Sequence, residues 1–219
     1  MLKEKIHVYC MPGLAADVNI FEFIKLPDEF VIHTISWKMP VKNEPLVDYA
    51  KRMSKEVEVD NAILIGVSFG GILVQEMNAF LNLKKLIIIS SVKSKHELPL
   101  RLQVIKTTKL YKLIPTGLIG KVKRWEQLFY GDMSKKIAQV YQKYLTVTNK
   151  DYLDWAIENV LEWKREKPIV GVIHIHGELD QVFPIENIKD CIVVPKANHA
   201  MILRRSKWFN EHLPKLILK

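Results

Sequence analysis

Short apolar runs recur along the chain and alternate with longer stretches whose apolar residues follow a helical period. Several short runs are apolar at every position, which is typical of strands covered by helices on both faces. We expect strands at residues 6–10, 30–36, 62–65, 86–89, 169–175 and 191–194. We expect helices at residues 18–25, 45–57, 69–81, 150–165 and 203–218. The alternation predicts an α/β fold with a mostly parallel sheet of about six strands flanked by helices.

One segment, from about residue 94 to residue 148, breaks this alternation. It carries several helical patterns and no clear strand, and it is too long and too patterned for a plain loop. We expect a helical cap inserted over the carboxyl edge of the sheet. Its apolar residues are expected to pack mainly within the cap, and they are Leu98, Leu102, Ile105, Leu110, Tyr111, Leu113, Trp125, Phe129 and Tyr130. Because no repeat or linker interrupts the chain, we predict a single domain over residues 1–219.

The charge balance alters this picture only slightly. Lys and Arg outnumber Asp and Glu by 33 to 24, which gives a net charge of +9. The basic residues are dispersed, and their clusters near residues 121–124, 164–167 and 204–205 are not interleaved with aromatic residues as a nucleic-acid platform would be. We therefore expect a solvated basic face and no nucleic-acid partner.

Compartment and membrane insertion can be judged from the apolar runs and the cysteines. No apolar run reaches the length of a bilayer span, and the first residues lead directly into a strand pattern without a signal peptide. Cys10 and Cys191 both lie in strand-like runs, where buried free thiols are expected rather than a disulfide or a metal site. These observations predict a cytoplasmic protein without membrane insertion.

The sequence Gly66-Val67-Ser68-Phe69-Gly70 lies between an expected strand and an expected helix. A serine between two glycines at such a junction is a nucleophile elbow, a turn so sharp that the serine is strained and the glycines leave no room for side chains. The Ser68 hydroxyl is then exposed at the carboxyl end of a strand, beside the positive end of a helix. Ser68 is therefore the candidate nucleophile.

A serine nucleophile needs a base, and the base needs an acid to orient it. Asp180 comes just after the expected strand at 169–175, and His199 follows the strand at 191–194. The chain order of serine, aspartate and histidine is the one expected for a nucleophile-elbow enzyme. Glu178 is interpreted as a solvated turn residue, and His174 and His176 as packing and turn residues.

Together, the elbow, the His176-Gly-x-x-Asp180 segment and the Asn198-His199 loop make the chain resemble the α/β-hydrolase fold superfamily, in its small form with a helical cap. The resemblance covers nearly the whole chain. It implies that Ser68 attacks an acyl carbon, that His199 carries the proton, and that Asp180 fixes the imidazole tautomer.

The oxyanion of such a reaction needs two hydrogen-bond donors. One is expected to be the backbone N–H of Phe69, directly after the nucleophile. The other is expected from the loop after the first strand, where members of the superfamily often carry His-Gly and this chain has Pro12-Gly13. We expect the Leu14 N–H, with those of Met11 and Gly13 as alternatives.

These features predict a carboxylesterase-like serine hydrolase that acts on a small ester, thioester or related acyl substrate through an acyl-enzyme. Because fold does not determine chemistry, a lyase or carbon–carbon hydrolase with the same triad is an alternative, and a ligand receptor or scaffold with little turnover is another. The sequence has no metal-ligand spacing, phosphate loop or dinucleotide fingerprint, so no metal or cofactor is expected.

Overall fold

A computed structural model describes residues 5–109 and 143–219 of the chain. The six predicted strands are confirmed, with ends that differ by a few residues from those expected. The strands are β1 (Ile6–Met11), β2 (Phe30–Thr34), β3 (Ala62–Val67), β4 (Leu83–Ile89), β5 (Ile173–Gly177) and β6 (Ile192–Val194).

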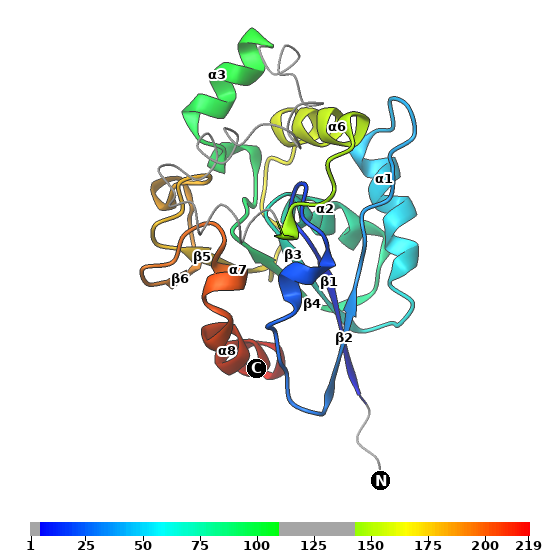
Figure 1. The fold of residues 1–219 in the computed structure, drawn as a ribbon, viewed down its shortest axis with the longest axis vertical. Coiled ribbons are helices and arrows are strands. Elements are labelled where there is room, and N and C mark those ends of the chain that lie inside the picture. Colours follow the sequence, from blue (N-terminus) through cyan, green and yellow to red (C-terminus); the bar gives the residue numbers. More distant parts are fainter. Residues whose placement is uncertain (1–4, 110–142) are drawn as a thin grey trace.

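The strands form one sheet in the order β2-β1-β3-β4-β5-β6, and each neighbouring pair is parallel (Figure 1). The predicted mostly parallel sheet is therefore confirmed. β3 lies inside the sheet, where Ile65 is in register with Cys10 of β1 and Ile87 of β4. Because the strands are parallel, the loops after β1, β3, β5 and β6 all leave from one edge of the sheet.

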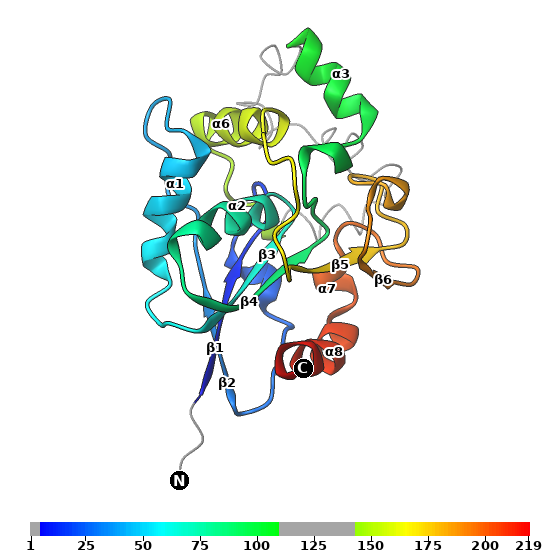
Figure 2. The ribbon, with the colours of Figure 1, turned by 180° about the vertical axis from the view of Figure 1, so that it is seen from behind.

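Helices cover both faces of the sheet, as the doubly apolar strands require. On one face, Leu64 packs in the same hydrophobic cluster as residues of α1 (Leu46–Met53) and α2 (Phe69–Met77), which lie side by side in Figure 2. On the other face, Ile63 and Ile65 pack with residues of α7 (Met201–Arg204) and α8 (Ser206–Leu218). Short 3-10 helices occupy Val18–Phe21, Ser54–Glu56, Asn78–Phe80, Lys95–Glu97 and Ile185–Asn187.

The predicted helix at residues 18–25 is wrong, since only a 3-10 turn forms at Val18–Phe21. The backbone beyond that turn bonds to another element instead of continuing the helix. Asn210 of α8 donates its side-chain amide to the carbonyl of Phe23 at 3.0 Å, and its amide oxygen accepts from the Lys25 N–H at 2.9 Å. These tertiary hydrogen bonds therefore occupy the backbone carbonyl and N–H groups that the next helical turn would otherwise have used.

Other predicted bounds also differ from the structure: the helices expected at 45–57 and 69–81 end at Met53 and Met77, and the helix expected at 203–218 is divided into α7 and α8. The expected helix at 150–165 is α6, which ends at Leu161 (Lys150–Leu161). The expected strand at 169–175 begins only at Ile173, because residues 169–172 form a turn in which Gly171 has a φ of 79°.

The proposed cap at 94–148 is described only in part. Residues 94–109 contain a 3-10 turn and the helix α3 (Leu100–Thr108), whereas the predicted cap residues Leu110, Tyr111, Leu113, Trp125, Phe129 and Tyr130 lie outside the described residues. Figure 1 shows α3 and α6 beyond the carboxyl ends of the strands. Lys106 of α3 pairs with Glu162, just after α6, at 3.3 Å. Arg101 of α3 donates to the carbonyl of Val182 at 2.9 Å, which ties α3 to the loop after β5.

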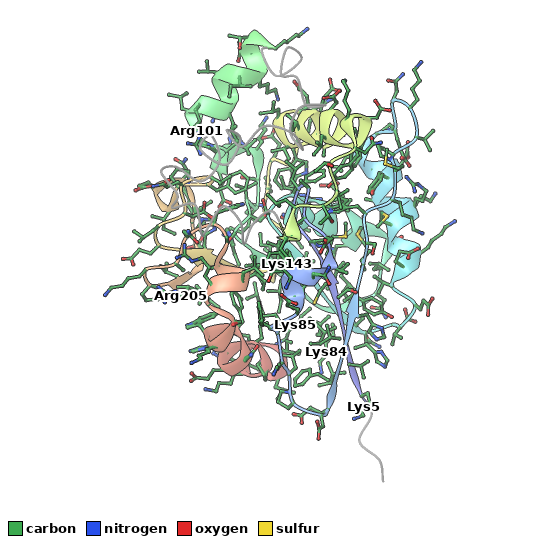
Figure 3. The ribbon with its side chains drawn as sticks, in the orientation of Figure 1. Lys5, Lys84, Lys85, Arg101, Lys143 and Arg205 are labelled. Atoms are coloured by element: carbon green, nitrogen blue, oxygen red, sulfur yellow. The ribbon has the colours of Figure 1, made fainter. Side chains whose placement is uncertain are left out.

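The basic side chains labelled in Figure 3 come from separate parts of the fold, including the start of β1, β4, α3 and the α7–α8 junction. At least one of them joins two elements of the fold, because Lys85 of β4 donates to the carbonyl of Leu216 in α8 at 2.8 Å. Among the residues that the structure describes, no helix is long and apolar enough to cross a membrane.

Candidate active site

Ser68 lies in the turn between β3 and α2, with φ 53° and ψ −120°. A side chain at this positive φ is strained, so neighbouring groups must hold the turn in place. The Ser68 N–H donates to the carbonyl of Ile89 at 2.9 Å, and the Ser68 carbonyl accepts from the Ser91 hydroxyl at 2.8 Å. Bonds to the neighbouring β4 strand and its following loop therefore fix the nucleophile candidate on both sides.

The glycines of the elbow have no room for a side chain. A Cβ on Gly66 would lie 2.4 Å from the carbonyl oxygen of Gly70, at the start of α2. A Cβ on Gly70 would lie 2.2 Å from the carbonyl oxygen of Pro12, in the loop after β1. The second glycine is thus required by the approach of the loop after β1, a contact that the motif alone does not specify.

Asp180 is buried in the turn after β5 and uses both carboxylate oxygens. Oδ1 accepts from the backbone N–H groups of Val182 at 2.8 Å and Phe183 at 2.9 Å, and Oδ2 lies 2.8 Å from Nδ1 of His199. Burial alone would raise the pKa of this carboxyl group, but attraction to His199 and His176 and the N–H donors outweigh it. The pKa of Asp180 is therefore below its ordinary value, and the side chain is a carboxylate at neutral pH.

His199 joins Asp180 to Ser68. It follows β6, and its Nε2 lies 2.9 Å from Oγ of Ser68. Because the carboxylate of Asp180 can only accept, Nδ1 of His199 carries the hydrogen of that bond. Nε2 is then free to accept the hydroxyl hydrogen of Ser68, which is the tautomer that a general base requires.

The loop after β1 closes the other side of Ser68. A Cβ on Gly13 would lie 3.2 Å from Cβ of Ser68, so the Gly13 backbone passes directly beside the serine. Phe69 is the first residue of α2, and an N–H at that position has no acceptor within its own helix. Phe69 and the Gly13–Leu14 loop thus flank Ser68, while the assignment of Phe69 and Leu14 as oxyanion donors stays a prediction.

Sequence reasoning missed the relation of His176 to Asp180. His176 is fully buried, its Nε2 donates to the carbonyl of Phe183 at 2.8 Å, and the same nitrogen lies 3.5 Å from Oδ2 of Asp180. Its Nδ1 lies 3.1 Å from Nε2 of His174. The signal available in the sequence was the spacing of four residues between His176 and Asp180 across a turn, but no pattern in the sequence indicates which way the imidazole points.

The buried histidine pair predicts acid sensitivity of the fold. Burial lowers the pKa of His174 to about 2, whereas a histidine in the unfolded chain titrates near 6.5. Between these values the unfolded chain binds a proton that the folded chain does not, so stability falls as the pH falls. From pH 7 to pH 5 we expect His174 to remove about 2 kcal/mol from the free energy of unfolding.

Urea unfolding of the wild type and His174→Gln at pH 7, 6 and 5 measures this effect. The variant, which cannot titrate at residue 174, should lose less stability than the wild type over this range. Equal losses in the two proteins would contradict the assignment.

Predictions from the sequence also concern Glu178 and the two cysteines, and the structure shows the surroundings of each. Glu178 is exposed, and its carboxylate accepts from the N–H of Lys196 at 2.7 Å, in agreement with its interpretation as a turn residue. Cys10 and Cys191 are free thiols, of which Cys10 is buried with a pKa raised to about 12 by burial. In residues 5–109 and 143–219, no group of three or more His, Cys, Asp or Glu side chains is arranged to hold a metal ion.

No protein-family model and no curated protein matches the chain. Solved structures do match over nearly its whole length. A bromoperoxidase from Bacillus anthracis is 14% identical with a TM-score of 0.70, and the match covers 98% of this chain and 92% of that one. An esterase from Exiguobacterium antarcticum is 18% identical with a TM-score of 0.65, over 99% and 93% of the two chains. An epoxide hydrolase is 14% identical with a TM-score of 0.69, over 98% and 92%.

Proposed function

We propose that the chain, which has the α/β-hydrolase fold, is a serine hydrolase acting on a small ester, thioester or related acyl substrate. The observation that carries the proposal is the hydrogen-bonded series from Asp180 through His199 to Ser68, with distances of 2.8 and 2.9 Å. The fold alone would not support it, because one fold carries many chemistries.

In the proposed mechanism, Oγ of Ser68 attacks the acyl carbon while Nε2 of His199 takes the hydroxyl proton. The imidazolium that forms is stabilised by the carboxylate of Asp180. The carbonyl oxygen becomes an oxyanion, which accepts hydrogen bonds from the N–H groups of Phe69 and Leu14. The start of α2 adds the positive end of a helix at the same point.

Collapse of this tetrahedral intermediate breaks the bond to the leaving group, which takes the proton from His199. The acyl group then remains as an ester on Ser68. Water attacks this ester with His199 as the base, a second oxyanion forms and collapses, and the acid product leaves with the Ser68 hydroxyl restored.

The alternative functions differ in what they require of this site. A receptor or scaffold with little turnover would be favoured by a His199 out of reach of Ser68, and the 2.9 Å between Nε2 and Oγ speaks against it. A lyase or carbon–carbon hydrolase could use the same three residues, but a lyase needs no acyl-enzyme. Trapping of the acyl-enzyme that an ester substrate forms therefore separates the lyase from the proposed hydrolase.

The free thiols of Cys10 and Cys191 agree with the reducing cytoplasm that we propose as the compartment.

The experiment is labelling with a fluorophosphonate probe, followed by mass spectrometry of the peptides, beside hydrolysis of short and medium p-nitrophenyl esters. We expect one phosphonyl adduct, on Ser68, and hydrolysis of at least the short esters. Ser36→Ala, which removes an exposed serine, is the matched control and should label like the wild type. The absence of an adduct, or an adduct on another serine, would overturn the proposal.

A further inference from the structure

Trp37 contacts both segments that flank Ser68, although no motif singles it out. It lies in the segment that follows β2, at the carboxyl edge of the sheet. Its indole Nε1–H donates to the carbonyl of Gly13 at 3.0 Å. Its ring stacks on the ring of Phe69, with 5.2 Å between centroids and 8° between planes. One side chain thus holds the loop after β1 and packs on the residue after the nucleophile.

The bond to the Gly13 carbonyl determines where the next N–H points. The C=O of Gly13 and the N–H of Leu14 belong to one planar peptide unit, and in a trans unit they point in opposite directions. No cis peptide occurs among the described residues. With its carbonyl held by the indole, the peptide unit directs the Leu14 N–H away from Trp37.

Without that bond the peptide unit would have more freedom. Glycine allows backbone rotations that other residues resist, so Gly13 alone does not fix the orientation. The Ala16 N–H also bonds to the Gly13 carbonyl, at 3.2 Å, but this bond only closes the turn on itself. The indole bond ties the turn to a different element of the fold.

Trp37 is itself held firmly. Its ring packs against the buried rings of Tyr152, at 5.3 Å, and Tyr49, at 6.4 Å. The Tyr49 hydroxyl donates to the carbonyl of Lys38 at 2.7 Å and accepts from the Lys38 N–H at 3.1 Å. The backbone next to Trp37 is therefore anchored to α1, and the indole has little freedom to leave Gly13.

We propose that Trp37 is a positioning residue, which sets the Leu14 N–H as the second oxyanion donor through its bond to the Gly13 carbonyl. This inference rests on the proposed hydrolase function. Losing the indole N–H loosens a donor that acts on the oxyanion, whereas the substrate in its ground state depends on it less. The effect should therefore fall on kcat with little change in KM.

The test compares ester hydrolysis by the wild type, Trp37→Phe and Trp163→Phe. Phenylalanine keeps an aromatic ring on Phe69 but cannot donate to Gly13. Trp163 is a matched control, because its indole also donates a hydrogen bond, at 3.0 Å to Glu76. We expect kcat to fall about 10- to 100-fold in Trp37→Phe, less than the 100- to 1,000-fold typical of deleting an oxyanion donor, and to stay within about twofold of wild type in Trp163→Phe.

A second variant separates the loss of the indole N–H from a loss of packing around residue 37. Replacing Trp37 by 3-benzothienylalanine keeps the shape of the indole and puts sulfur in place of the N–H. It should reproduce the fall in kcat while losing no more stability than one hydrogen bond contributes. A kcat within about twofold of wild type in this variant, or an effect confined to KM, would overturn the inference. Ser68→Ala, assayed in parallel, separates the two failures: if that variant loses activity while the Trp37 variants keep theirs, only the role of Trp37 is wrong.

Discussion

Ser68→Ala is expected to lower kcat for a short p-nitrophenyl ester by about a millionfold, the loss typical of deleting a serine nucleophile whose other groups act only with it. Alanine lacks the oxygen that forms the acyl-enzyme, and His199 then has no hydroxyl to activate. The remaining donors near residue 68 still favour an oxyanion, so a small rate above the uncatalysed reaction should persist.

The same substitution should leave the fold intact. The bonds that hold the elbow use the backbone N–H and carbonyl of residue 68, which alanine retains. Steady-state kinetics and urea unfolding of the same preparation check both expectations, with Ser36→Ala as the control. Activity that survives in Ser68→Ala would show that the nucleophile is another residue.

Asp180→Asn is expected to lower kcat by about ten thousandfold, through the tautomer of His199. The asparagine oxygen can still accept from the N–H groups of Val182 and Phe183, as Oδ1 of Asp180 does. Its amide nitrogen then faces Nδ1 of His199 and donates to it. The imidazole hydrogen moves to Nε2, which can no longer accept the proton of Ser68.

Glu178→Gln is the matched control for this substitution, since it removes a carboxylate two residues away that is exposed and bonds to the Lys196 N–H. It should keep kcat within about twofold of wild type. The measurement is kcat for both variants at one pH near neutrality. Similar losses in the two variants would contradict the assignment of Asp180 as the residue that orients His199.

Much of the fold could be predicted because its cause is local. Each strand of the sheet contains an apolar run that indicates it, although the ends differ, and the elbow needs two glycines and a serine at one junction. The grouping of Ser68, Asp180 and His199 followed from a single topological rule, that parallel strands end at one edge. The order of the strands across the sheet does not follow from any of these local patterns.

What could not be predicted depends on contacts between distant parts of the chain. Residues 22–25 leave the helical path because Asn210, from the far end of the chain, bonds to their backbone. The contact of Trp37 with Gly13 depends on how two loops meet above the sheet. No periodicity or motif encodes such meetings, since they arise only from the packed structure.

The residues of the candidate site follow strands that differ in length and in burial. Ser68 follows β3, whose residues are all buried, whereas His199 follows the three-residue strand β6, which in the part of the chain that the structure describes pairs only with β5. Elements at an edge open locally at a lower free energy than the interior, without unfolding the rest. Such an opening is expected to move His199, the proposed base, away from Ser68, the proposed nucleophile. Under the proposed function, local opening at β6 is therefore expected to lower activity without lowering the free energy of global unfolding.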